Sequence, residues 1–212
     1  MGTSDTKKQL ELKALQFFAR NDFERSNLND IAKALGVTKG AIYHYFSSKE
    51  DLFLAAVNQL LDMMMDMFGQ GLPRDIPINI LLDNLFHMEE MMVEVSRSLG
   101  LEEGLNEYKN ILYLFLTGIK KFPDLQERID ALYSGFTDSL EDLLNAGIVR
   151  GEIRRDVDSK AIAYEITAFY EGALLLGAFS NKKDYIVLGP RVCQSIWERI
   201  AVESVAAIEG RK

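Results

Sequence analysis

Residues 28–53 read LNDIAKALGVTKGAIYHYFSSKEDLF, and two short amphipathic segments in this stretch are separated by Gly36 and Val37. Apolar residues recur here every three or four positions, which is the spacing of helices and not of strands. Two short helices joined by a glycine-containing turn have the dimensions of a helix-turn-helix, whose second helix enters the major groove of DNA. Gly36 suits such a turn because glycine adopts a positive φ without the steric penalty of a Cβ atom.

The buried side of this stretch predicts a three-helix core. We expect the two short helices over residues 27–35 and 38–46, packed against an earlier helix over residues 4–21. Asn27, with Asp30 three residues further on, predicts an N-cap for the first short helix. The apolar positions expected to hold the helices together are Ile31, Leu35, Ile42 and Phe46.

The opposite side of the second short helix carries hydrogen-bonding and cationic groups beside two very small residues. Such a surface can lie close to base edges and phosphates. A further helix is expected from Ser48, and Lys49 stands in its first turn. A cation is unfavourable there against the helix dipole, so a bound phosphate would explain it. The predicted DNA-binding residues are Asn27, Thr38, Lys39, Gly40, Ala41, Tyr43, His44 and Lys49.

The rest of the chain predicts longer helices and no strands. The four prolines fall between segments with helical apolar spacing. The longer helices are expected over residues 48–68, 78–99, 106–121, 123–146, 159–179 and 187–208. Gly147 and Gly151 suit the end of the helix that begins at Pro123. The fold class predicted is therefore all-α, with about nine helices.

Charge and composition limit the classes of function. The net charge of −8 argues against nucleic acid, but the first 50 residues hold eight basic and six acidic residues, against 16 and 26 in the remainder. No apolar run approaches the ~20 residues of a membrane span, and residues 1–10 are polar, so we expect a cytoplasmic protein without a membrane segment. The single cysteine, Cys193, excludes an internal disulfide.

Residues 10–53 resemble the DNA-binding domain of the TetR/AcrR family of transcriptional regulators. The residues that carry the resemblance are Ala14, Phe18, Phe23, Ile31, Ala32, Gly36, Val37, Tyr43, Phe46, Lys49, Leu52 and Phe53. One departure is Asp22, which stands where the family usually has glycine. Because aspartate tolerates left-handed backbone geometry better than most residues, we expect an altered turn there.

The resemblance implies a ligand-responsive regulator, most often a repressor, that binds a pseudo-palindromic operator in double-stranded DNA as a homodimer. A small-molecule effector would release it from DNA. The implied domains are a helix-turn-helix DNA-binding domain over residues 1–50 and a larger helical domain for effector binding and dimerisation over residues 51–212.

An apolar effector pocket is predicted within the larger domain. Met63 and Met67 are one turn apart, and methionine suits adaptable apolar sites. Facing helices could add aromatic side chains, and a few polar groups would orient the ligand. The predicted pocket residues are Met63, Met67, Phe86, Tyr113, Tyr170 and Glu171. The effector expected is a hydrophobic or aromatic small molecule.

Other functions have weaker support in the sequence. The methionines could bind a soft metal, but only Cys193, His44 and His87 could add stronger ligands, so we expect no metal site. No catalytic or cofactor-binding motif occurs, so neither an enzyme nor a cofactor is expected. Two alternatives stay open: an all-α carrier or enzyme that uses the same pocket, and a DNA-binding regulator without an effector.

Overall fold

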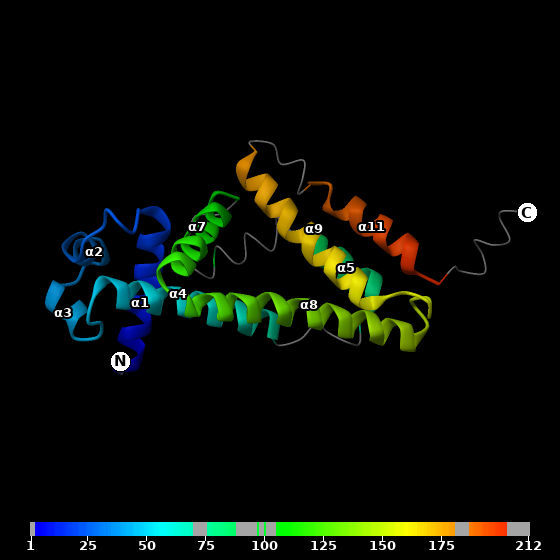
Figure 1. Cartoon of the computed structure of the whole chain (residues 1–212), viewed down its shortest axis with the longest axis horizontal. Helices are drawn as coiled ribbons and strands as arrows, with labels where there is room; N and C mark the ends of the chain where they lie inside the picture. Colours follow the sequence, from blue (N-terminus) through cyan, green and yellow to red (C-terminus); the bar gives the residue numbers. More distant parts are fainter. Residues whose placement is uncertain are drawn as a thin grey trace, which may run out of the picture. The chain divides into compact units, whose positions relative to one another are not determined.

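The protein is all-α, as its sequence predicts. The computed structural model describes residues 3–69, 76–87, 97, 100, 105–180 and 187–202. Nine helices and no strand occur in these residues (Figure 1), and the only extended pairing among them is an isolated antiparallel bridge between Ile153 and Ala201. None of the helices described is both long and apolar enough to cross a membrane.

The helices follow one another along the chain as in Figure 1: α1 (Thr3–Arg20), α2 (Leu28–Leu35), α3 (Lys39–Tyr43), α4 (Lys49–Gly69), α5 (Ile78–Phe86), α7 (Leu105–Lys121), α8 (Asp124–Arg150), α9 (Ser159–Phe179) and α11 (Gly189–Ile200). The chain divides into two compact units. Unit 1 consists of residues 1–67 and 92–133, and unit 2 of residues 68–91 and 134–212. The functional boundary expected at residue 50 stays a prediction.

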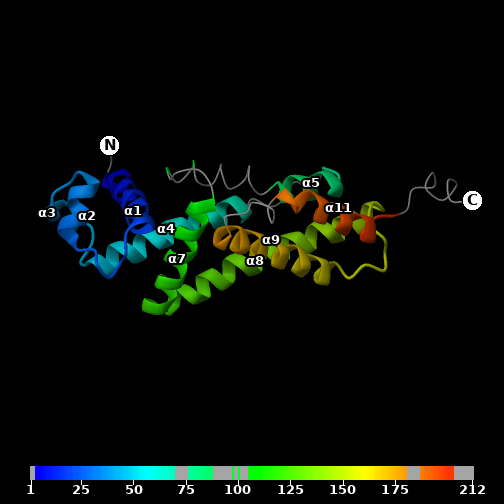
Figure 2. The ribbon, with the colours of Figure 1, turned by 90° about the horizontal axis from the view of Figure 1, so that it is seen from above.

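Unit 1 contains the helix-turn-helix, and Figure 2 shows α1, α2 and α3 grouped beside the start of α4. Its core is aromatic. The ring of Phe53 on α4 lies 5.1 Å from that of Phe18 on α1 and 4.7 Å from that of Phe23 in the following turn. Phe122, just after α7, stacks on Phe53 at 6.0 Å. Burial of these large side chains fixes the first helices to the start of α4.

Local hydrogen bonds define both short helices. Asn27 caps α2, since its side-chain oxygen accepts from the backbone N–H groups of Asn29 and Asp30 at 2.9 and 3.1 Å. Gly36 ends α2 with a φ of 69°, in the left-handed region, and Thr38 caps α3 by accepting from the Ala41 N–H at 3.1 Å. The four predicted core positions are all buried: Ile31, Leu35, Ile42 and Phe46. The expected helix-turn-helix core is therefore confirmed.

Unit 2 contains α5, α9, α11 and the later part of α8. Helix α11 packs on α5 (Figure 2), and a Cβ atom at Gly189 would stand 2.6 Å from the Phe86 carbonyl oxygen. The Phe86 ring is buried and stacks on Phe169 of α9 at 5.5 Å. The only tryptophan of the chain, Trp197, is half-buried on α11.

Two predicted helix ends are wrong. Helix α8 continues through Gly147 to Arg150, and Gly151, with a φ of 77°, ends it. Gly147 serves packing instead, because a Cβ atom there would stand 2.8 Å from Ile78 and 2.9 Å from Ile153 side-chain carbons. The helix expected over residues 78–99 ends as α5 at Phe86, with His87 as its C-cap, and residues 88–96, 98 and 99 lie outside those described.

The last helix ends at Ile200, before the predicted residue 208. Ala201 is extended, with φ −63° and ψ 149°, and pairs with Ile153. The Val202 N–H donates to the Glu152 carbonyl oxygen at 3.0 Å, and the Arg154 N–H donates to the Ile200 carbonyl oxygen at 2.9 Å. Pairing with a segment about fifty residues earlier ends the helix, so local sequence spacing could not predict this position.

Candidate DNA-binding site

The predicted reading surface lies on α3, its N-cap Thr38 and its C-cap His44. The side chains of Thr38, Lys39, Tyr43 and His44 are exposed, as is Gly40, and Ala41 is half-buried between them. The Lys39 ammonium stands 5.7 Å from the centre of the Tyr43 ring. This short helix therefore presents a cation, hydroxyl groups and an imidazole to solvent, while its neighbour Ile42 is buried in the core.

Gly40 has no structural requirement in the protein itself. A Cβ atom at this position would meet only the Thr38 hydroxyl oxygen, at 3.9 Å, which is ordinary contact. Its φ is not positive either, unlike that of Gly36. The absence of a side chain on the exposed face of α3 is thus not explained by packing or by backbone strain, and it leaves room for close approach by a partner.

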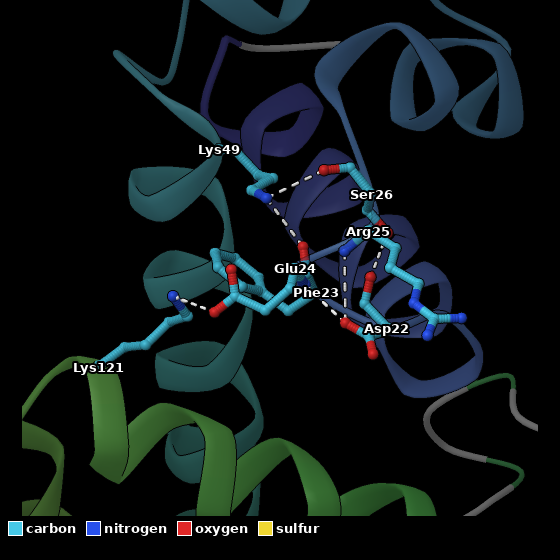
Figure 3. A network of polar contacts seen from close by, with 7 residues as sticks. All are labelled: Asp22, Phe23, Glu24, Arg25, Ser26, Lys49 and Lys121. Atoms are coloured by element: carbon cyan, nitrogen blue, oxygen red, sulfur yellow. Dashed lines mark hydrogen bonds and ion pairs between the residues drawn. The ribbon is translucent and has the colours of Figure 1, made fainter.

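Lys49, at the start of α4, is half-buried and bonded within the protein (Figure 3). Its ammonium donates to the carbonyl oxygens of Phe23 at 2.8 Å and Ser26 at 2.9 Å, and it stands 4.2 Å from the centre of the Phe23 ring. These two bonds use two of the three hydrogens that a lysine can donate. Lys49 therefore joins the α1–α2 turn to α4, a role that sequence reasoning missed because the acceptors are distant in the chain.

The turn between α1 and α2 is built around Asp22, and its geometry corrects the sequence expectation. No residue other than glycine has a positive φ in the part of the chain described, so Asp22 is not left-handed. Its carboxylate accepts from the N–H groups of Glu24 at 2.7 Å and Arg25 at 3.3 Å, as Figure 3 shows. Its carbonyl oxygen accepts from the N–H and the hydroxyl of Ser26 at 3.1 and 2.7 Å. A side chain thus shapes this turn.

The predicted pocket residues fall in both units, and their assignment to a pocket stays a prediction. In unit 2, Phe86 and Tyr170 are buried and Glu171 is half-buried. Burial, and to a lesser degree the charge of Glu171, raises the pKa of the Tyr170 hydroxyl above its usual value, so it stays protonated. In unit 1, Met63 is half-buried and Tyr113 is 42% exposed. The side chain of Met67 lies outside the described residues.

Sequence reasoning missed Gln59, which lies one turn before Met63 on α4. Its side-chain oxygen is buried and has no hydrogen-bond partner among the residues that the structure describes. A buried unpaired acceptor is costly unless a donor reaches it. In the sequence, the only sign of this residue's role is a polar amide side chain among the apolar residues of α4.

A shallow depression in unit 2 contains none of the predicted pocket residues. It is lined by Arg154, Asp156, Val157, Asp158, Ala161, Ile162, Glu198, Arg199 and Ile200.

Two family profiles match the chain. One, described as "Bacterial regulatory proteins, tetR family", matches residues 13–56, and the other, "Tetracyclin repressor-like, C-terminal domain", matches residues 120–188. The chain is 27% identical over 182 residues to the Fatty acid metabolism regulator protein of Bacillus subtilis, covering 85% of this chain and 88% of that protein. It is 24% identical to the HTH-type transcriptional repressor BepR of Brucella suis, covering 91% and 90% of the two chains.

Solved structures share the fold over nearly the whole chain. A TetR-family transcriptional regulator from Cytophaga hutchinsonii superposes with a TM-score of 0.75 at 20% identity, covering 96% of this chain and 99% of that one. A TetR transcriptional regulator from Chloroflexus aurantiacus gives 0.72 at 25% identity, covering 94% and 98%. With a helix-turn-helix in α2 and α3 and family matches in both halves of the sequence, the chain belongs to the TetR family of DNA-binding transcriptional regulators.

Proposed function

We propose that this regulator is a cytoplasmic repressor that binds a pseudo-palindromic operator as a homodimer and leaves DNA when a small molecule binds. Residues 1–50 would bind DNA, and residues 51–212 would bind the effector and form the dimer. The observation that carries the DNA-binding part is the surface of α3, where polar and cationic groups surround a glycine that the protein's own packing does not need.

On DNA, Lys39 is the residue proposed to read bases, because lysine can donate to guanine O6 and N7 in the major groove. Gly40 and Ala41 let α3 approach the base edges, while Thr38, Tyr43 and His44 contact bases or phosphates. Asn27 and Lys49 would face phosphates at the N-termini of α2 and α4. Two of the three ammonium hydrogens of Lys49 are donated to carbonyl groups of the turn, and the third can be donated to a phosphate.

The proposed dimer forms through the last two helices, α9 and α11, and the exposed face of α9 supports it. This helix exposes Tyr164, Leu176 and Phe179 by 59, 46 and 75%, and the small residue Ala168 is exposed beside them. Exposed apolar faces of this kind mark interaction surfaces. A second copy of the chain would cover the face, and the resulting two-fold symmetry would present two α3 helices to two equivalent half-sites.

The proposed effector is a hydrophobic or aromatic small molecule, and the residues predicted from the sequence stay its candidate contacts: Met63, Met67, Phe86, Tyr113, Tyr170 and Glu171. A hydrogen-bond donor on the effector would satisfy the buried oxygen of Gln59, one turn before Met63. Because effector and DNA favour different states, each must weaken the binding of the other by the same factor.

Helix α4 is the proposed link between the two sites. It starts at Lys49, which holds the α1–α2 turn, and it carries Gln59 and Met63 further along. Arg128 of α8 pairs with Asp62 of α4 and donates to Asn58 on the same helix, so a shift of either helix is transmitted to the other. A ligand that displaces α4 would therefore change the position of the DNA-binding helices.

Selection of bound DNA from random sequence tests the proposal. We expect a palindromic motif whose half-sites are separated by about one turn of DNA, roughly 10 base pairs, or a multiple of it. Recovery of no motif by a folded protein would contradict DNA reading and would favour the carrier or enzyme. A motif combined with a melting temperature that no compound in a broad ligand screen raises would favour the regulator without an effector.

A further inference from the structure

Phe23 lies between two lysines that are far apart in the sequence. The Phe23 ring is buried in the turn between α1 and α2. The ammonium of Lys49, from the start of α4, stands 4.2 Å from the ring centre, and that of Lys121, the last residue of α7, stands 4.7 Å from it (Figure 3). An aromatic ring attracts a cation over its face, and more strongly when the pair is shielded from water.

Glu24 completes this arrangement. Its carboxylate lies 2.5 Å from the Lys121 ammonium, and the hydrogen bond from Lys121 lowers the pKa of Glu24 below its usual value. The Glu24 side chain is 69% exposed, and an ion pair of that kind alone adds little to stability. Lys121 differs from a simple surface partner, because its side chain is only 27% exposed and its ammonium also faces a buried ring. We call Phe23, Glu24, Lys49 and Lys121 the Phe23 clasp.

The Phe23 clasp is connected to the DNA-binding helices by a continuous series of contacts. Lys49 donates to the carbonyl oxygens of Phe23 and Ser26, and Ser26 is bonded back to Asp22 through its N–H and hydroxyl groups. Ser26 immediately precedes Asn27, the N-cap of α2. The start of α2 is therefore held by the same turn that carries Phe23, and α2 leads into α3 through Gly36.

We propose that Lys121 is a positioning residue for DNA binding: through the Phe23 clasp it fixes the α1–α2 turn, and thereby the orientation of α2 and α3, without touching DNA. The proposal rests on the DNA-binding function proposed above. It makes the end of α7 a second connection to the DNA-binding helices, separate from the length of α4. A ligand that moves the end of α7 would change DNA affinity through this connection.

The test compares two neighbouring lysines of α7 in the full-length protein. Lys121→Met removes the cation and keeps an unbranched side chain, whereas Lys120→Met makes the same change of net charge at an exposed position. Operator affinity is measured over a range of salt concentrations, beside thermal unfolding. We expect Lys121→Met to bind at least about threefold more weakly than Lys120→Met, and Lys121→Arg to bind like the unaltered protein, since arginine keeps the ring contact and the ion pair.

The salt dependence separates positioning from a direct phosphate contact. Loss of one phosphate contact in each protomer lowers the slope of log affinity against log salt by about 1.8. A positioning residue leaves the slope equal to that of Lys120→Met. A reduced slope for Lys121→Met would overturn the proposal, as would an operator affinity equal to that of Lys120→Met, whether or not the melting temperature falls.

A second variant covers the case in which Lys121→Met does not fold. Glu24→Gln changes an exposed side chain, and it should weaken operator binding in the same direction, with a slope that does not fall. If Lys121→Met does fold, the losses of operator affinity in the double variant should overlap instead of adding, because both substitutions remove the Glu24–Lys121 contact. If Glu24→Gln binds the operator as tightly as the unaltered protein does, the positioning role of the Phe23 clasp is wrong, but the proposed DNA-binding function stands. If the unaltered protein binds no DNA, the proposed function itself is wrong.

Discussion

Gly40→Ala tests whether Gly40 serves DNA binding or the fold of the free protein. The substitution should raise the stability of the free protein and lower its affinity for the operator. In the free protein the added methyl group meets only the Thr38 hydroxyl, at 3.9 Å, and the backbone there suits any residue. A glycine-to-alanine change at a compatible position raises the free energy of unfolding by about 0.4–1 kcal/mol. The melting temperature of a chain of this size should therefore rise by about 1–4 °C.

On DNA the same methyl group should lower the affinity for the operator. If the Gly40 face of α3 lies against base edges, the methyl group moves α3 outward in both half-sites. A lost base contact costs about 1–3 kcal/mol, so two half-sites lose about 2 kcal/mol or more, which is roughly 30-fold in affinity. The expected result is a more stable protein that binds its operator more weakly.

Gly36→Ala is the matched control. A Cβ atom at Gly36 meets nothing within 4 Å, but the φ of 69° makes alanine strained there by about 1–2 kcal/mol. This variant should melt earlier and, while folded, bind DNA much as the unaltered protein does. Thermal unfolding and fluorescence anisotropy on the selected operator measure both quantities. Undiminished operator affinity of Gly40→Ala would refute the placement of this face against DNA.

Four further variants test the remaining parts of the proposal. Lys39→Ala should relax base preference at one position in each half-site, at about 1–3 kcal/mol, and an unchanged motif in DNA selection would remove Lys39 from the reading residues. Tyr164→Glu combined with Leu176→Glu should yield folded monomers in sedimentation, since both side chains are exposed in one protomer; a persistent dimer would place the interface elsewhere. Met67→Glu should abolish release by effector without weakening DNA binding, and Gln59→Leu should reduce effector affinity; normal release by the Met67 variant would exclude it from the pocket.

The helix-turn-helix could be predicted because its determinants are local. The turn after α2 has Gly36 at a φ of 69°, which glycine adopts without a Cβ penalty, and Asn27 caps α2 through N–H groups two and three residues away. The buried positions of α2 and α3 follow one helical period, so spacing alone identifies them. The same holds for the exposed residues of α3, which occupy the opposite side.

The features that escaped prediction depend on residues far apart in the chain. Gly147 looks like a helix end until Ile78 and Ile153 are seen to occupy the space beside it. Lys49 looks like a free cation at a helix start, although Phe23 and Ser26 provide its acceptors. Sequence spacing describes a helix and its immediate ends, but it carries no information on which distant backbone packs against them.

Trp197 is half-buried, so its fluorescence can show whether the two units unfold together or separately. Because α11 belongs to unit 2 and the chain has no other tryptophan, indole emission follows the loss of structure around α11 and is blind to the helix-turn-helix. Far-ultraviolet ellipticity, in contrast, sums over the helices of both units. Coincident midpoints for the two signals would mean that both units melt in one cooperative step, whereas separate midpoints would give each unit a stability of its own.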